Sequence, residues 1–316
     1  MGPCIKSRCL LITISFLVVA GRVCAERPRP ENVVAWGDNT YGQCSVGAGL
    51  FTNIAAGKDY SIAMSSNGAL AGWGSNVYGQ RTVPGGMFKA IAAASWHSLG
   101  IRNDGTLVAW GGNWNGEGNV PIGTFSTIAT GLEHSLAIRS EGTLAAWGDD
   151  RYGQSTVPSG TFKAVAAGWY YSLGIHSDGT LAAWGNNWDG RCNVPAGTFT
   201  AVAATAMSTS LAIRTDGTLV AWGGNQWDEL RNVPSGTFSA IAAGEDFFLG
   251  LRIDGTLVAW GDNTYGECNV PSGRFTTVAA GANHGLAIAI PEPSSLLALA
   301  GGIAGLSGIA LRRKRR

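Results

Sequence analysis

The 316-residue sequence has few charged residues and lacks the common arrangements of catalytic side chains. It contains no pair of acid and base carboxylates, no nucleophile elbow and no phosphate-binding loop, because its many glycines fall in turns. Residues 26–290 carry 14 basic and 20 acidic residues, a net charge of −6, without the basic patch that binds a phosphate backbone. We therefore expect a protein that is not an enzyme, needs no cofactor or metal and binds no nucleic acid.

The N-terminal residues are typical of a secretory signal. Two basic residues precede an uncharged run from Leu10 to Ala20, and Val23-Cys24-Ala25 has the small residues of a cleavage site. We expect a signal peptide over residues 1–25, cleaved after Ala25, and a short linker over 26–31. An arginine at position 22 stands where a lipoprotein signal needs a small or aliphatic residue, which disfavours lipidation of Cys24.

The C-terminal residues 291–316 combine three features of a sorting signal. The motif Pro291-Glu292-Pro293 precedes an uncharged segment over 294–311, and a run of basic residues ends the chain. As a helix, the uncharged segment reaches about 27 Å, enough for a transmembrane helix in a bilayer core of roughly 30 Å. The basic end would stay on the cytoplasmic side.

This tail resembles the PEP-CTERM sorting signal of Gram-negative bacteria. The resemblance implies an exosortase as partner, transient anchoring in the inner membrane, removal of the helix, and release or attachment at the cell surface or in the extracellular matrix. A permanent membrane anchor is the alternative, since hydropathy alone does not show cleavage.

Between the two ends, one Trp-Gly pair recurs at nearly constant spacing. The seven framework tryptophans are Trp36, Trp73, Trp110, Trp147, Trp184, Trp222 and Trp260. A period of this length indicates a supersecondary unit that is stable only against its neighbours. Each unit contains three strand-length apolar segments, and the last two are joined by a hairpin such as Asn103-Asp104-Gly105.

These features predict an all-β fold over residues 32–290, a seven-bladed β-propeller with about three strands per blade. The first strand of each unit is nearly all small residues, as in Val165-Ala166-Ala167-Gly168, so we place it at the crowded central axis. The chain begins with a third strand and ends with a first and a second strand. The N-terminal strand is therefore expected to complete the last blade and close the ring.

The repeats resemble the regulator of chromosome condensation family, and most closely its short, three-stranded secreted form, the propeller-type β-lactamase inhibitory proteins. The matching segments are Ala146 to Pro158 and Gly131 to Ile138. The resemblance covers residues 32–290 and implies the fold. It does not specify the function, because one scaffold hosts many binding roles.

The histidines and cysteines of the repeats do not predict a metal site or a disulfide. His97, His134 and His284 share one position that other units fill with tyrosine, threonine or phenylalanine, which indicates packing. Cys44 and Cys268 share a position on neighbouring blades, and such positions lie about 13 Å apart at a radius of ~15 Å, beyond the roughly 7 Å between Cα atoms that a disulfide allows. With Cys192 they are expected to be thiols.

A ligand-binding rim is predicted where the copies differ most, in the turn after the first strand. The residues chosen there are Lys58, Asp59, Trp96, Glu133, Trp169, Tyr170, Met207, Glu245, Asp246 and Asn283. Strand direction places Trp114, Trp188 and Trp227 on the same rim, but they alternate with tyrosines in a constant position, which favours a structural role. Exposed aromatic residues among charges on a rigid ring are typical of a protein- or glycan-binding face.

We therefore expect an exported, non-enzymatic propeller that binds an unknown protein or polysaccharide through one loop rim, as a surface or matrix component sorted by an exosortase. The alternative is a secreted inhibitor of an extracellular enzyme such as a β-lactamase. In either case only the C-terminal helix would enter a membrane, before processing.

Overall fold

The computed structural model describes residues 32–206, 208–224 and 232–290, and every regular element in these ranges is a β-strand. No helix long and apolar enough to cross a bilayer occurs in this part of the chain. Several predictions lie outside it: the signal peptide with Ala25, the linker over 26–31, Met207, Trp227, and the sorting signal with Pro291, Glu292, Pro293 and the helix over 294–311.

The strands of the described residues form seven three-stranded antiparallel sheets, each of which is one blade of a propeller. Blades 1 to 3 consist of β2 (Phe51–Ala56), β3 (Tyr60–Ser65) and β4 (Leu70–Gly74); β5 (Phe88–Ala93), β6 (His97–Arg102) and β7 (Leu107–Gly111); and β8 (Phe125–Thr130), β9 (His134–Arg139) and β10 (Leu144–Gly148). Blades 4 to 6 consist of β11 (Phe162–Ala167), β12 (Tyr171–His176) and β13 (Leu181–Gly185); β14 (Phe199–Ala204), β15 (Ser210–Arg214) and β16 (Leu219–Trp222); and β17 (Phe238–Ala243), β18 (Phe247–Arg252) and β19 (Leu257–Gly261).

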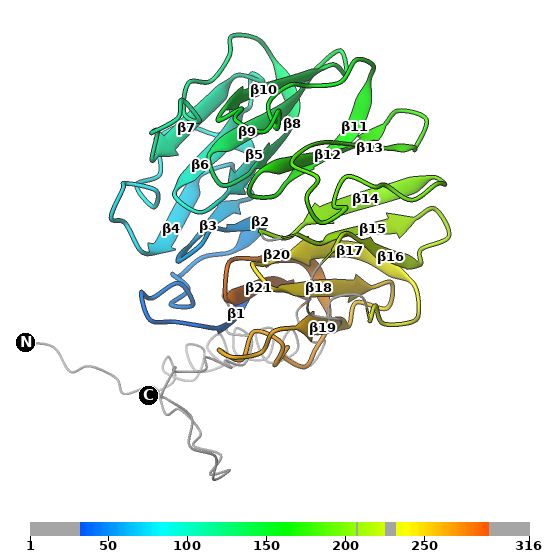
Figure 1. Ribbon diagram of the computed structural model, residues 1–316. Coiled ribbons are helices and arrows are strands. Elements are labelled where there is room, and N and C mark those ends of the chain that lie inside the picture. The colour runs from blue at the N-terminus through cyan, green and yellow to red at the C-terminus, as the bar shows by residue number, and fades with distance from the viewer. Residues whose placement is uncertain (1–31, 207, 225–231, 291–316) are drawn as a thin grey trace, which may run out of the picture.

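Blade 7 joins the two ends of the described chain, as predicted. It consists of β20 (Phe275–Ala280), β21 (His284–Ala289) and β1 (Val33–Gly37), in the order β1-β21-β20. The register of the closing pair runs from Val33 opposite Ile288 to Gly37 opposite His284. Figure 1 shows β1 beside β21 and the blades arranged around one axis. The ring is thus closed by backbone pairing, which leaves no blade without neighbours.

The predicted hairpins join the second and third strands of blades 1 to 6. In each of them the glycine adopts a positive φ between +85° and +97°, as at Gly68 and Gly179. Residues with a Cβ rarely adopt this conformation, so a glycine is needed at this position. An acidic or amide residue followed by glycine therefore predicts the hairpin from the sequence alone. Blade 7 has no such hairpin, since its third strand comes from the other end of the chain.

The Trp-Gly pair is repeated because both of its residues have a structural task. The indole Nε1 of Trp110 donates a hydrogen bond to the carbonyl of Gln80 at 2.9 Å, in the loop that arrives from the preceding blade, and Trp147 does the same to Glu117 at 2.8 Å. The glycine after Trp110 has a φ of +99°, and a Cβ there would lie 2.5 Å from the carbonyl oxygen of Trp96. No other residue type fits this glycine position without strain.

The shared histidine position is a contact between blades. His97 Nε2 lies 2.9 Å from Ser135 Oγ in the next blade, and the same contact joins His134 to Ser172. The Ser135 hydroxyl also donates to the carbonyl of Glu117 at 3.0 Å, so its single proton is used there and the imidazole must be the donor to Ser135.

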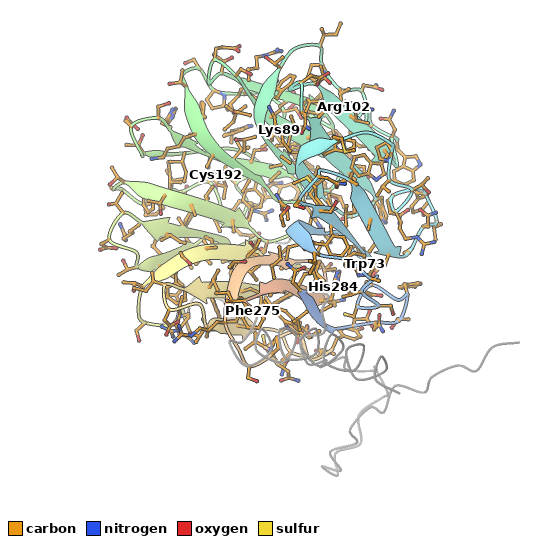
Figure 2. All side chains as sticks on the ribbon, turned by 180° about the vertical axis from the view of Figure 1, so that it is seen from behind. Trp73, Lys89, Arg102, Cys192, Phe275 and His284 are labelled. Carbon is orange, nitrogen blue, oxygen red and sulfur yellow. The ribbon has the colours of Figure 1, made fainter. Side chains whose placement is uncertain are left out.

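This contact closes the ring as well, because His284 of blade 7 meets Ser61 of blade 1 at 2.9 Å. Figure 2 shows side chains filling the wedges between the sheets, with His284 and Trp73 on neighbouring blades. Burial lowers the pKa of His97 to about 3 and those of His134 and His284 to about 4, so all three are neutral at pH 7. The packing role predicted for them is confirmed.

Candidate functional site

The upper rim, defined here as the edge at which the first strand of each blade ends, is built from two kinds of segment. One is the short turn between the first and second strands; the other is the long loop that follows the third strand. Backbone hydrogen bonds join the two within a blade, from Gly112 N to Trp96 O and from Asp149 N to Glu133 O, both 2.8 Å. The structure therefore places the turn and the loop on one rim, as strand direction predicts.

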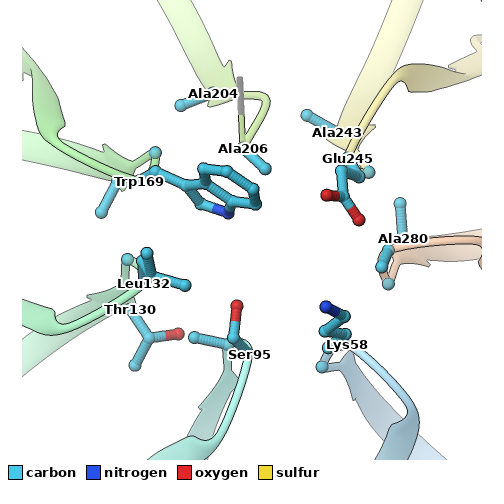
Figure 3. A pocket seen from close by; sticks show the side chains of 18 of the residues that line it. Lys58, Ser95, Thr130, Leu132, Trp169, Ala204, Ala206, Ala243, Glu245 and Ala280 are labelled. Atoms are coloured by element: carbon cyan, nitrogen blue, oxygen red, sulfur yellow. The ribbon is translucent and has the colours of Figure 1, made fainter. Parts of the chain in front are cut away.

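The predicted rim residues separate into an inner and an outer set. The first residue of each turn lines a pocket of about 90 Å³ at the mouth of the propeller axis, and Lys58, Trp169 and Glu245 belong to this inner set. Alanines at the ends of the inner strands form much of the remaining wall, which agrees with the predicted position of these strands. Figure 3 shows the indole of Trp169 extending over the pocket, with the Lys58 ammonium and the Glu245 carboxylate across from it.

The small residues before these turns let the blades approach closely at the axis. Backbone hydrogen bonds run from one turn to the next, from Lys58 N to Ala94 O at 3.1 Å and from Glu245 N to Ala282 O at 3.1 Å. A Cβ on Gly131 would lie 2.5 Å from the carbonyl oxygen of Gly168 in the next blade. The pocket therefore has a wall of linked backbone, which holds its side chains in fixed positions.

Charge in the pocket is locally balanced. Burial raises the pKa of Glu245, and the Lys58 ammonium opposes that shift while Asp246 and Asp59 add to it. Burial likewise raises the pKa of Asp59 and of Asp246. The ammonium of Lys58 also lies 5.9 Å from the ring centroid of Trp96, within the range of a cation–π contact.

Trp96, in the outer set, is the centre of a cluster of three rings. Its ring centroid lies 6.4 Å from that of Tyr78 and 5.6 Å from that of Trp114, and the Tyr78 and Trp114 centroids are 4.7 Å apart, all edge-on. Trp114 is 54% exposed. We call Tyr78, Trp96 and Trp114 the first aromatic cluster.

A second aromatic cluster surrounds Tyr170. Tyr152 lies 5.2 Å from Tyr170 and 5.2 Å from Trp188, measured between ring centroids, and Trp169 lies 6.4 Å from Tyr170. Trp188 is 73% exposed. Because Trp169 lies over the pocket, the second aromatic cluster (Tyr152, Trp169, Tyr170 and Trp188) connects the outer rim with the axis.

The other predicted outer residues are polar. Glu133, between the two clusters, makes an ion pair of 2.9 Å with Arg151, which also contacts Asp149 at 2.9 Å. The backbone carbonyl of Asn283 accepts a hydrogen bond from Asp38 N at 2.8 Å. None of the described rim residues that we predicted is fully exposed; each is partly covered by its neighbouring loops.

Trp114 and Trp188, for which the repeat pattern favours a structural role, are exposed. Their position is at the surface, and the tyrosines that fill it in other units are exposed as well: Tyr41, Tyr78, Tyr152 and Tyr265. The ion pair of Glu133 with Arg151 was not predicted from the sequence. A signal for these contacts was present, because the rings at positions 78, 96 and 114, and those at 152, 170 and 188, follow one another at the interval that separates Glu133 from Arg151.

The described residues contain no group of histidine, cysteine and carboxylate side chains that could hold a metal ion. The three cysteines are thiols, as predicted. That of Cys44 donates to the carbonyl of Asp38 at 3.1 Å, and that of Cys268 to the carbonyl of Asp262 at 3.1 Å. These hydrogen bonds lie within the long rim loops and stabilise their conformation.

Comparisons with known proteins agree with this geometry. The regulator of chromosome condensation (RCC1) repeat matches residues 51–80, 88–118, 125–154, 162–191 and 238–267, and the PEP-CTERM protein-sorting motif matches residues 289–316. No curated protein matches the sequence.

Solved structures of the same fold have low sequence identity to the chain. Human WBSCR16 is 17% identical with a TM-score of 0.71, covering 82% of this chain and 100% of its own. Prp20p from Saccharomyces cerevisiae is 16% identical with a TM-score of 0.71, covering 87% and 95%. The ectodomain of the receptor kinase CR4 from Physcomitrella patens is 19% identical with a TM-score of 0.63, covering 73% and 69%.

At these identities the structural likeness establishes the fold alone. The sorting motif supports export of the chain and its processing by an exosortase. The chain is therefore a seven-bladed propeller that contains five RCC1 repeats and carries a PEP-CTERM protein-sorting motif at its C-terminus.

Proposed function

We propose that this protein is an exported, non-enzymatic binding module that holds a protein or a polysaccharide on its upper rim. One observation supports this most strongly: the six exposed aromatic side chains of the described residues all belong to upper-rim loops. They are Tyr41, Tyr78, Trp114, Tyr152, Trp188 and Tyr265. Tryptophan and tyrosine supply large contact areas at low entropic cost and dominate binding hot spots.

The lower rim, at the opposite edge of the blades, has among the described residues arginines stacked on phenylalanines instead of exposed aromatic side chains. Four of its arginines stack on the phenylalanines that begin the inner strands of blades 2, 3, 5 and 6, as Arg102 does on Phe88 with 5.3 Å between the guanidinium carbon and the ring centroid. The Arg102 guanidinium also donates to the carbonyl of Gly85 at 3.1 Å. Since these four charges already have a contact within their own blades, the lower rim is the weaker candidate for a partner.

We propose that the protein reaches the cell surface or extracellular matrix of a Gram-negative bacterium, after signal cleavage at Ala25 and exosortase processing near Pro291. The acidic body disfavours nucleic acid as a partner. Inhibition of an extracellular enzyme such as a β-lactamase is the second candidate, because a rigid rim with aromatic anchors also fits a protein cleft.

The test is capture of a partner by the immobilised full-length protein from the cell-surface and matrix fraction. A variant with Trp96→Ala, Trp169→Ala and Tyr170→Ala removes the centres of both clusters. A matched control removes three apolar side chains from the lower rim, with Met87→Ala, Ile122→Ala and Ile253→Ala, all exposed in the structure.

We expect material retained by the wild type and the control but lost by the rim variant, at equal thermal stability of all three. Protease and glycosidase treatment then separates a protein from a polysaccharide, and nanomolar inhibition of a β-lactamase would support the second candidate. Equal retention by all three proteins would refute the upper rim as the binding surface. Chemical conversion of the retained material by the protein would refute the non-enzymatic role.

A further inference from the structure

The axial pocket combines an indole, an ammonium group and a carboxylate. On one side the indole of Trp169 extends over the pocket; the opposite side carries the ammonium of Lys58 and the carboxylate of Glu245. Most of the rest of the wall is alanine and glycine backbone. An apolar pocket with a few convergent polar groups is the usual form of a site for a small molecule or for one unit of a polymer.

The balance of charge argues against an ionic ligand. A cationic group would meet the Lys58 ammonium, and an anionic group would meet Glu245, whose ionisation is already opposed by burial and by the nearby Asp246 and Asp59. A neutral polyhydroxylated ligand avoids both conflicts. Its hydroxyls can accept from the ammonium and donate to the carboxylate, while its C–H face lies against the indole.

The size of the pocket fits one ring of such a ligand. About 90 Å³ leaves room for several water molecules, at roughly 10–15 Å³ for each in this measure, and so for one ring-sized group rather than a folded peptide segment. Displacing these waters is favourable only if the entering group replaces their hydrogen bonds, which hydroxyls do.

Aromatic surface continues from the pocket in two directions. On one side Trp169 contacts Tyr170 of the second aromatic cluster, with 6.4 Å between ring centroids. On the other side the Lys58 ammonium lies 5.9 Å from the Trp96 centroid of the first aromatic cluster. A chain of sugar units can therefore extend from the pocket across the rim and stack on exposed rings at both ends.

We propose that the axial pocket binds one neutral glycosyl unit of a polysaccharide, with Trp169 as the stacking platform, Lys58 as hydrogen-bond donor and Glu245 as acceptor. This assignment rests on the proposed binding function of the upper rim and names its ligand class.

The experiment titrates the full-length protein by calorimetry with neutral hexasaccharides of glucose in three linkages, maltohexaose, cellohexaose and laminarihexaose, and with N-acetylchitohexaose. Polygalacturonate and a chitosan hexamer serve as the anionic and cationic probes. We expect at least one neutral probe to bind, with affinity lowered at least tenfold by Trp169→Ala and within about threefold of wild type in Trp169→Phe.

Matched lysine variants isolate the polar contact. Lys58→Met is expected to weaken binding severalfold, whereas Lys89→Met, at an exposed lysine near the lower rim, leaves it unchanged. Loss of binding in Lys89→Met, binding of charged probes alone, or no binding of any neutral probe would overturn the assignment.

The outcome separates this inference from the proposed function. If the rim captures a protease-sensitive partner through Trp96 and Tyr170 while no neutral sugar binds, the glycan assignment fails and the binding rim stands. If neither a partner nor a sugar is retained, both fail.

Discussion

Replacing Glu267 by glutamine is expected to stabilise the propeller at alkaline pH and to remove part of its pH dependence. In two equivalent rim loops a glutamine holds an aspartate: Gln43 Nε2 donates to Asp38 Oδ2 at 2.9 Å, and Gln154 Nε2 donates to Asp149 Oδ2 at 2.8 Å. In the loop after β19 the same two positions carry Glu267 and Asp262. A carboxylate cannot donate unless it is protonated.

The structure shows an unfavourable surrounding for the charged form of Glu267. Its side chain is 1% exposed, one carboxylate oxygen accepts from Tyr265 N at 2.8 Å, and the other has no hydrogen-bond partner among the described residues. Burial raises the pKa of Glu267 to about 7, and Asp262 adds to the shift. The loop also matters for ring closure, because Trp36 Nε1 donates to the carbonyl of Glu267 at 2.7 Å.

The direction of the pH dependence of stability follows from the raised pKa of Glu267. Because the folded-state pKa lies above the unfolded value, the folded protein binds an extra proton, so this contribution to stability is complete below about pH 4.5 and is lost as pH rises through 7. At about 1.4 kcal/mol for each unit of pKa the full difference is roughly 3 kcal/mol. The interval from pH 5 to 8.5 covers only part of this titration, and we expect roughly 2 kcal/mol between these two pH values.

Denaturant unfolding of the full-length protein at pH 5 and 8.5 measures this difference in the free energy of unfolding directly. Glu267→Gln should gain about 2 kcal/mol relative to wild type at pH 8.5 and little at pH 5. The reverse change Gln154→Glu places a carboxylate against Asp149 and should introduce the same pH dependence into another blade. A Glu267→Gln variant that differs from wild type by the same amount at both pH values would refute the reasoning.

Three further predictions concern other parts of the ring. The neutral histidines between blades have pKa values lowered to about 3 to 4, below the unfolded value, so stability should fall as pH drops from about 6.5 to 4, by up to about 1.4 kcal/mol per pH unit for each, which unfolding at successive pH values would reveal. Gly281→Ala would push a Cβ into the carbonyl of Gly57 and should cost roughly 2–3 kcal/mol in denaturant unfolding, whereas Ala94→Gly, at the same repeat position in blade 2, should cost less than about 1 kcal/mol. Trp188→Ala should leave the melting temperature nearly unchanged, because the ring is 73% exposed, and still reduce capture of the rim ligand; an equal loss of stability would mean that Trp188 is structural.

Much of the fold follows from the sequence because each repeated residue acts locally. The hairpin glycine needs a positive φ, the Trp-Gly glycine needs both a positive φ and space, and small residues are needed where inner strands crowd. The Trp-Gly requirement recurs in every blade and the hairpin requirement in blades 1 to 6, so the nearly constant period of the Trp-Gly pair counts the blades. The closing strand could be predicted too, since the chain starts with the third strand that the last unit lacks.

The candidate site could be predicted only in outline. Divergence among copies indicated the rim and the residues of its turns, including Trp96, Trp169 and Tyr170. It did not show that the first residue of each turn faces the axis while the second faces the outer loops, because that depends on how each turn is linked to the next blade. Nor did it show that Trp114 and Trp188 are exposed: their constant position in the repeat looks structural, although it lies at the surface.

What the sequence by itself determined is the number of blades, the order of their strands and the identity of the loop-bearing rim, because these depend on periodicity and local backbone conformation. What the tertiary structure alone decided is which side chains meet. Lys58, Trp169 and Glu245 lie far apart in the chain and share one pocket because closure of the ring brings blades 1, 4 and 6 around a single axis.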